Sequence, residues 1–369
     1  MTSILSQVKI GLGFGGIGEG KEAGVFSNED YVRTIHEAYD IGYRFFDTAE
    51  AYADGRSESL LGAALSGSRS DAIVATKVSP HNLSSKSMQN AAKNSLRRIA
   101  TEAIDLYQVH WPNPEIPVGE VADGLSKLFQ AGHIRAVGVC NYSARQAKEL
   151  MLEIPHIPFI SSQVELSMVD QYPLGRVHDW AQKEGVATLA YSPLGKGRIA
   201  HLKPLDELLG LLANEFGATK AQVSLSWLAS LGAVLPIPAS RNAQHLKENF
   251  DFSSINLSEE ASKRISGLLV GEKLMSVPPS QIEVAVDGEG SRAVYTTLKQ
   301  AQENPLDFCP SPQALSMEII LDRDIKPVRI QRRQSGLFLV EGRVRFWSWV
   351  IAFGFDEPIP CVILDDVVA

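Results

Sequence analysis

The sequence predicts an α/β fold, a closed (β/α)₈ (TIM) barrel followed by a small α+β domain. Three observations support this prediction. Short apolar runs alternate with amphipathic stretches eight times between residues 8 and 270, as in parallel β/α units. The chain has 369 residues, more than the roughly 250 of an ordinary barrel. Residues 277–280, Val-Pro-Pro-Ser, interrupt the pattern, so we expect a barrel domain over 1–277 and a second domain over 278–369.

The eight predicted barrel strands are continuous apolar runs, which is typical of parallel strands buried on both faces. They are Val8–Phe14, Arg44–Phe46, Ala72–Thr76, Ile104–Val109, Arg135–Cys140, Phe159–Leu166, Val186–Tyr191 and Ala233–Ile237. Because a helical stretch follows each strand after a short connection, the sequence favours a closed barrel over the alternative, an open doubly wound sheet.

The barrel helices are predicted from apolar residues at helical spacing and from capping signals. Ser27 with Asp30 resembles a capping box, and Gly42 ends the helix that follows. A longer connection over Gly195–Asp206 precedes one or two helices up to Ser230. Further apolar helix faces lie within Leu60–Leu65, Met88–Ile99, Val121–Phe129 and Glu259–Leu269.

The second predicted domain mixes helices and strands. Its predicted helices are Leu298–Gln302, Pro312–Leu321 and Arg345–Phe353, and its strands are Pro327–Arg332, Leu337–Glu341 and Ile359–Leu364. Gly354 ends the last helix. Trp347 and Trp349 are two residues apart on that helix, so we expect one of them to be exposed.

Charge and cysteine content exclude several classes of protein. The net charge is −8, and neither predicted domain is basic, so nucleic acid is not an expected partner. The three cysteines, Cys140, Cys309 and Cys361, are far apart and form neither a metal-binding spacing nor a disulfide framework. The first residues lack a signal-peptide pattern, and no apolar run approaches the roughly 18 residues of a membrane span. We expect a cytoplasmic protein without a membrane partner.

A glycine-rich segment follows the first predicted strand. Residues 11–16 fit the pattern G-x-G-x-x-G, but a dinucleotide fingerprint needs a helix to begin at once. The next helix signal comes only at Ser27. We interpret the segment as a turn at the barrel mouth that passes close to a ligand, with Gly15 as a candidate contact.

Polar residues directly follow four of the predicted strands. They are Asp47, Lys77, His110 and Asn141, and Tyr52 comes five residues after Asp47. Singly, each has an ordinary explanation as a cap, a structural histidine or a solvated lysine. In a barrel, however, these strand ends meet at one mouth, where catalytic groups gather. A charged Lys77 paired with Asp47 is expected to lower the pKa of Tyr52, so that the phenol donates a proton at neutral pH.

Several segments resemble the aldo-keto reductase superfamily over about residues 8–270. They are Phe45–Tyr52, Gly55–Gly62, Ala75–Val78, Tyr107–Pro112, Gly138–Ser143, Gln163–Glu165, Tyr191–Gly195 and Pro236–Asn249. The resemblance implies a (β/α)₈ barrel that reduces an aldehyde or ketone with NAD(P)H. It also implies that Tyr52 is the general acid, with Asp47, Lys77 and His110 completing a catalytic tetrad.

The same resemblance implies the cofactor contacts. Asn141 and Gln163 would hold the carboxamide, and Tyr191 would stack on the nicotinamide ring. Ser192 and Leu194 match pyrophosphate contacts, and the adenosine end would lie against Ser240, Arg241, Glu248 and Asn249. Trp111 is predicted to be a wall of the substrate pocket, with an ordinary core aromatic as the alternative.

Two residues depart from the family pattern. Cys140 stands where a serine is usual, and Ala239 where many members carry a lysine. Arg241 could still clamp a 2′-phosphate, so NADPH is the predicted cofactor and NADH the alternative. No charged residue in the loops identifies the carbonyl substrate.

The second domain resembles the superfamily of the ParB amino-terminal domain and sulfiredoxin over about residues 280–369. The resemblance rests on Asp322–Val328, Phe338–Phe346, Ala352–Gly354 and Ile359–Val362. Gly342 and Arg345 keep the family's Gly-x-x-Arg spacing, and the resemblance implies that this turn contacts the phosphate groups of a nucleotide. Arg343-Val344 replaces the family's Cys-His or Glu-Arg pair, so neither sulfinic-acid repair nor nucleotide hydrolysis is expected, and a packing surface is favoured.

The predicted function is therefore NADPH-dependent reduction of a small carbonyl compound. The alternative is a redox sensor or scaffold that binds the cofactor. In that alternative, the second domain serves as an interaction or nucleotide-binding module.

Overall fold

The computed structural model describes residues 4–15, 27–269, 274–284, 295–322, 325–333 and 335–364. These residues form two compact units. The first holds the described residues up to Pro112 and Ile116–Leu269, and the second holds Asn113–Glu115 and the described residues from Leu274 onward. The division of the chain into two domains at residue 278 stays a prediction. Within the described ranges, no helix has both the length and the apolar character needed to cross a membrane.

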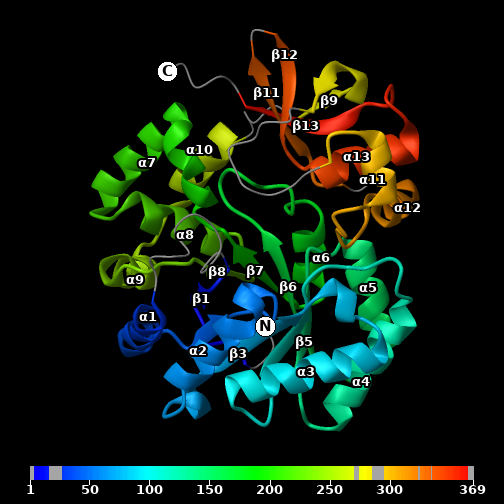
Figure 1. Ribbon diagram of the computed structural model, residues 1–369. Coiled ribbons are helices and arrows are strands. Elements are labelled where there is room, and N and C mark those ends of the chain that lie inside the picture. The colour runs from blue at the N-terminus through cyan, green and yellow to red at the C-terminus, as the bar shows by residue number, and fades with distance from the viewer. Residues whose placement is uncertain are drawn as a thin grey trace. The chain divides into compact units, whose positions relative to one another are not determined.

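The first unit contains the predicted eight-stranded barrel (Figure 1). Its strands are β1 (Gly11–Gly13), β2 (Phe45–Asp47), β3 (Ile73–Val78), β4 (Leu106–Val109), β5 (Val137–Cys140), β6 (Phe159–Glu165), β7 (Ala187–Tyr191) and β8 (Val234–Ile237). Each strand pairs in parallel with the next along the chain. The Gly13 N–H donates to the Pro238 carbonyl at 3.0 Å and joins the first strand to the last. The eight predicted strands are confirmed, and the open-sheet alternative is wrong because the strand order is sequential.

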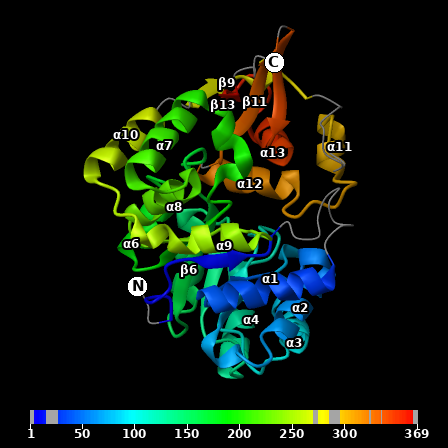
Figure 2. The same cartoon turned by 90° about the vertical axis from the view of Figure 1, so that its left-hand side faces the viewer.

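Helices follow the strands and pack around the barrel. They are α1 (Asn28–Ile41), α2 (Arg56–Ala64), α3 (Ser85–Ile99), α4 (Val118–Gln130), α5 (Ala144–Glu153), α6 (Val177–Lys183), α7 (Lys203–Phe216), α8 (Lys220–Ser230), α9 (Ala243–Phe250) and α10 (Glu259–Leu269). The predicted capping box is confirmed, since Ser27 and Asp30 exchange hydrogen bonds at the start of α1. Figure 2 shows α9 beside α1, where the Phe250 ring packs on Tyr43.

The interior of the barrel is apolar toward the amino ends of the strands, here called the lower layer, and polar at their carboxyl ends. Small and branched side chains fill the lower layer, including Ala75, Leu106 and Ala187. Successive side chains of a strand point to opposite faces, so residues two apart share a face. Asp47 therefore shares the inward face of β2 with the buried Phe45, and Lys77 shares the inward face of β3 with the buried Ala75. The polar layer therefore sits at the carboxyl ends of the strands, directly above a packed core.

The second unit is built on a five-stranded mixed sheet in the order β10-β12-β11-β13-β9. Its strands are β9 (Leu274–Val277), β10 (Ile282–Glu283), β11 (Val328–Arg333), β12 (Gly336–Glu341) and β13 (Ile359–Leu364), and its helices are α11 (Leu298–Glu303), α12 (Pro312–Asp322) and α13 (Arg343–Phe353). The three predicted strands and three predicted helices are confirmed. Strands β9 and β10 were not predicted, and β9 precedes Pro278 yet pairs with β13.

The expectation of one exposed tryptophan on α13 is wrong. Trp347 and Trp349 are only 4% and 3% exposed. The helix packs against β11 on one side and against α11 and α12 on others, so it is apolar around most of its circumference. Each indole N–H also donates a hydrogen bond to a backbone carbonyl. Trp347 donates to Tyr295 at 3.0 Å, and Trp349 donates to Glu357 at 2.9 Å.

Candidate active site

A buried lysine links three groups at the mouth of the barrel. The Lys77 ammonium donates to Asp47 Oδ2 at 2.5 Å, to the Thr48 carbonyl at 2.8 Å and to the Tyr52 hydroxyl at 3.2 Å. An ammonium has three donors, so this arrangement uses all of them. Because the Tyr52 oxygen accepts from Lys77, its own proton is left to point elsewhere. The structure thus brings three of the predicted tetrad residues into direct contact.

The charge of Lys77 is maintained despite its burial. Burial disfavours the charged form, but the Asp47 carboxylate and the Tyr52 hydroxyl outweigh that effect and raise the pKa of Lys77 above its ordinary value. A buried charge without such partners would be strongly disfavoured. The site therefore holds a permanent cation against the Tyr52 oxygen.

The predicted lowering of the Tyr52 pKa is wrong in its net direction. Burial of the phenol raises the pKa of Tyr52, and this effect exceeds the opposing influence of Lys77. The sequence indicates the neighbouring cation, but it does not reveal how little water reaches the hydroxyl. The Tyr52 phenol therefore stays protonated at neutral pH.

His110 lies beside Tyr52 at the end of β4. The two rings meet edge to face, with centroids 5.6 Å apart. Burial and the nearby Lys77 charge lower the pKa of His110 to about 3. The imidazole is therefore neutral at physiological pH and offers one N–H donor. All four predicted tetrad residues gather at one place.

Three residues predicted to hold a nicotinamide lie next to this cluster. Tyr191 donates its hydroxyl to Asn141 Oδ1 at 3.0 Å, and Asn141 Nδ2 donates to the His110 carbonyl at 3.2 Å. The Asn141 N–H donates to the Gln163 carbonyl at 2.9 Å. Asn141 has φ +61° and Ser192 has φ +50°, a strained conformation that often marks functional sites. Cys140, beside Asn141, is buried.

Gly15 lies close to the Tyr52 hydroxyl. A Cβ atom at Gly15 would stand 3.2 Å from that oxygen. Gly16, the last residue of the glycine pattern, lies outside the described residues, and the following helix begins only at Asn28. Gly15 therefore lies directly beside the phenol oxygen, where any larger residue would crowd it.

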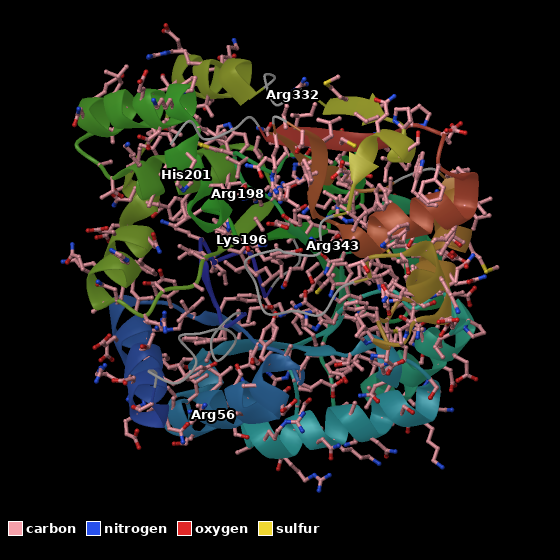
Figure 3. All side chains as sticks on the ribbon, turned by 45° about the horizontal axis from the view of Figure 1, so that its top comes forward. Arg56, Lys196, Arg198, His201, Arg332 and Arg343 are labelled. Atoms are coloured by element: carbon pink, nitrogen blue, oxygen red, sulfur yellow. The ribbon has the colours of Figure 1, made fainter. Side chains whose placement is uncertain are left out.

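The segment after β7 carries basic side chains that pair with the end of β6. Lys196 and Arg198 lie 2.9 and 3.4 Å from the Glu165 carboxylate. Figure 3 shows them near His201 on the turn Gly195–His201, with Arg56 on α2 further away. The predicted pyrophosphate contacts Ser192 and Leu194 immediately precede this turn. Sequence reasoning missed the pairing, although Glu165 belongs to the quoted Gln-Val-Glu segment.

The predicted adenosine contacts follow β8. Ser240 exchanges hydrogen bonds with Asn242, which caps α9. Glu248 accepts from Gln244 at 2.8 Å on the same helix, Arg241 is exposed and Asn249 is buried. Ser240 and Arg241 follow the carboxyl end of β8, whereas Glu248 and Asn249 lie near the end of α9. The assignment of all four to the adenosine end stays a prediction.

Trp111 is 42% exposed. An ordinary core aromatic would be buried, so that alternative is wrong. The ring directly follows His110 at the barrel mouth. A role as a wall of the substrate pocket remains a prediction that its exposure allows.

Two inward-facing polar residues were missed by sequence reasoning. Gln108 Nε2 donates to Asp47 Oδ1 at 3.2 Å, and Ser161 Oγ donates to Gln108 Oε1 at 3.1 Å. Gln163 Nε2 reaches the same Asp47 oxygen at 2.8 Å. One signal in the sequence could have identified Gln108: it is a glutamine inside an apolar strand. It lies two residues after Leu106, whose side chain faces the barrel interior, and two residues before His110.

In the second unit, the Gly-x-x-Arg pair holds a turn together. Arg345 Nη1 donates to the carbonyls of Lys326 and Pro327, both at 2.7 Å. Gly342 has φ +96°, and a Cβ atom there would stand 2.9 Å from Arg345 Nη2. The guanidinium thus occupies the space that the glycine leaves open. These contacts fit a packing role, while the likeness to the ParB and sulfiredoxin superfamily stays a prediction.

Comparison with known proteins agrees with this geometry. Residues 9–270 match the aldo/keto reductase family, and the chain belongs to that family. It is 33% identical over 251 residues to an aldo-keto reductase of Mycolicibacterium smegmatis, covering 67% of this chain and 87% of that protein. It is 32% identical over 252 residues to the methylglyoxal reductase DkgA of Escherichia coli K12, covering 67% and 88%. A crystal structure of an aldo/keto reductase from Klebsiella pneumoniae with NADP and acetate has 29% identity and a TM-score of 0.61, covering 71% and 91%.

Proposed function

We propose that the protein is an NADPH-dependent carbonyl reductase in which Tyr52 is the general acid. One observation carries the proposal: the Lys77 ammonium contacts both Asp47 and the Tyr52 oxygen inside a buried polar layer. That contact leaves the phenol proton free to be given to a substrate oxygen. A protonated group placed within reach of the reacting atom is what general acid catalysis requires.

The residues at the mouth fit a nicotinamide cofactor. Asn141 and Gln163 supply amide groups that suit a carboxamide, and Tyr191 supplies an aromatic face beside them. A Cβ atom at Gly15 would stand 3.2 Å from the Tyr52 hydroxyl, so the glycine keeps that side of the phenol free of a further side chain. Arg241 offers an exposed guanidinium for a 2′-phosphate, and a family member has been crystallised with NADP. NADPH is therefore the cofactor that we assign to the site.

Each member of the tetrad has a separate task in this scheme. NADPH, when bound, supplies the hydride for the carbonyl carbon. Tyr52 gives its proton to the carbonyl oxygen, which prevents an alkoxide from accumulating in the dry site. His110, neutral because of its burial, orients the same oxygen as a hydrogen-bond donor. Lys77 steadies the phenol oxygen as negative charge develops there, and Asp47 keeps Lys77 in place.

The substrate is proposed to be a small aldehyde or ketone. The methylglyoxal reductase of E. coli, to which the chain is similar, makes methylglyoxal a sensible first member of a substrate panel. Trp111 lies exposed beside the tetrad and would border the carbonyl substituents. A panel that varies these substituents while NADPH absorbance is followed would define the substrate class.

Tyr52→Phe tests the assignment of the acid. The variant should lose turnover by about 10²-fold or more, while NADPH still quenches the protein fluorescence at similar concentrations. The matched control is Tyr39→Phe, which removes a phenol that donates to Asp71 on the outer surface and should leave turnover unchanged. Turnover that survives in Tyr52→Phe would show that another group donates the proton. Tight binding of NADPH without its oxidation by any carbonyl of the panel would instead favour the alternative function, a redox sensor that binds the cofactor.

A further inference from the structure

The Asp47 carboxylate is held from two directions in the polar layer of the barrel. Lys77 occupies Oδ2, while the side-chain amides of Gln108 and Gln163 both donate to Oδ1. The two amides come from different strands, β4 and β6. Asp47, Gln108 and Gln163 are all buried, so these donors replace the water that would otherwise solvate the carboxylate.

The amides of Gln108 and Gln163 differ in their other hydrogen-bond partners. Gln108 Oε1 accepts from Ser161 Oγ at 3.1 Å, so both ends of this amide are used inside the barrel. Because a carboxylate only accepts hydrogen bonds, Nε2 of Gln108 must face Asp47, and the Ser161 hydroxyl must be the donor to Oε1. Gln163 lies at the end of β6, and under the proposed function its amide also serves the carboxamide of the cofactor.

The position of Ser161 is specified by a neighbouring glycine. Gly138 and Ser161 are register partners on β5 and β6, and Gly138 lies opposite Gln108 on β4. A Cβ atom at position 138 would stand 2.0 Å from Ser161 Oγ. A glycine inside a strand weakens the strand, yet here it alone leaves room for the hydroxyl beneath Gln108.

We propose that Gln108, held by Ser161, is a positioning residue that keeps Asp47 directed at Lys77. Gln163 is then the amide shared with the cofactor, and Gln108 the amide dedicated to the tetrad. The inference rests on the proposed function, since it assigns Gln108 a task in the same proton transfer. Gln108 touches neither the phenol nor the substrate and acts through Asp47 and Lys77.

The consequence is measurable in the alcohol-oxidation direction, where Tyr52 must lose its proton. If Gln108 is removed, Asp47 holds Lys77 less firmly, and the ammonium stabilises the Tyr52 phenolate less. The rising limb of kcat for oxidation, which follows the deprotonation of Tyr52, should then move to higher pH. A residue that only filled space in the barrel would lower stability without moving that limb.

The test uses Gln108→Leu, Ser161→Ala and the double variant in the full chain, with NADP⁺ and the alcohol product of the best carbonyl found in the panel. Gln108→Leu should lower kcat about tenfold and move the limb up by about one pH unit, with little change in the KM for NADP⁺. Ser161→Ala should shift it less, in the same direction. The double variant should resemble Gln108→Leu alone, because Ser161 acts only through Gln108. Gln89→Leu, which removes an amide from α3 on the outside of the barrel, is the control.

An unmoved limb in Gln108→Leu, or additive effects in the double variant, would overturn the inference. Should Gln108→Leu fail to fold, Ser161→Ala carries the test alone, and an unmoved limb in that variant overturns it equally. The proposed function fails by a different result, namely turnover that persists in Tyr52→Phe. An inactive Tyr52→Phe with an unmoved limb in Gln108→Leu leaves the proposed function standing and removes only the role of Gln108.

Discussion

The barrel mouth and the Gly342 turn of the second unit each fix a basic side chain with hydrogen bonds, but to partners of different kinds. Lys77 spends two of its three hydrogen bonds on side chains that can carry charge, Asp47 and Tyr52. Arg345 directs its Nη1 hydrogen bonds to two backbone carbonyls, those of Lys326 and Pro327. A Cβ atom at Gly15 would stand 3.2 Å from the Tyr52 hydroxyl, and one at Gly342 would stand 2.9 Å from Arg345 Nη2, so each glycine lets a side chain come close. The cation at the barrel mouth therefore contacts a hydroxyl that can exchange a proton, whereas Arg345, which also lies 3.9 Å from the Glu341 carboxylate, ties a turn together.

Replacing the barrel cation should give the largest effect. Lys77→Met removes the charge that stabilises the Tyr52 oxygen and leaves Asp47 buried without its cation. We expect carbonyl reduction to fall by about 10³-fold, with some loss of stability because an unpaired buried charge is costly. NADPH oxidation rates and thermal unfolding measure the two effects separately.

The matched variant Arg345→Met tests the contrast between the two cations. If it lost carbonyl reduction as Lys77→Met should, the two sites would not differ in function. Removing the guanidinium leaves the carbonyls of Lys326 and Pro327 without this hydrogen-bond donor. We expect the free energy of unfolding to fall by about 1–3 kcal/mol. The reductase kcat should not change. A large fall in kcat in Arg345→Met would mean that the second unit takes part in turnover and would end the distinction drawn between the two sites.

The neutral state of His110 predicts a pH effect of intermediate size. Its pKa is about 3 in the folded protein and about 6.5 when unfolded. The unfolded chain therefore binds a proton first as the pH falls, so stability from this residue is complete above pH 6.5 and declines toward pH 3. The decline is at most about 1.4 kcal/mol per pH unit.

His110→Gln should remove that contribution. Its unfolding free energy, measured by denaturant titration from pH 7 down to pH 4, should fall less steeply than that of the unmodified chain. Equal slopes for the two proteins would mean that His110 is already charged in the folded state, and the neutral donor role would then be wrong.

The smallest predicted effect concerns Cys140. Burial raises the pKa of this thiol, so it stays neutral, and a thiol is a weak hydrogen-bond donor. Cys140→Ser would place a stronger donor next to Asn141, which is proposed to hold the carboxamide. The KM for NADPH should fall about threefold at unchanged kcat, and a KM that rises would place the carboxamide elsewhere.

The sequence predicts most of the architecture because continuous apolar strands and capping signals are local features. The gathering of Asp47, Tyr52, Lys77 and His110 at the barrel mouth was predictable because polar residues directly follow apolar strands and lie in family motifs, while their catalytic roles stay a prediction. Gln108 was missed because a polar residue inside an apolar strand gives no sign of what it faces. The pKa direction of Tyr52 was missed because burial depends on packing across the whole mouth. Strand β9 was missed because four residues pair with a strand more than eighty residues away.

That long-range pairing has a consequence for how the second unit can be made. Its edge strand β9 ends at Val277 and needs β13, which runs from Ile359 to Leu364. During synthesis β9 must wait unpaired until almost all of the chain has emerged, and such non-local pairing slows folding. A gene fragment cut at Pro278 would also leave the outer side of β13 unpaired, and exposed strand edges recruit other chains. Expression of the second unit on its own should therefore start upstream of Leu274.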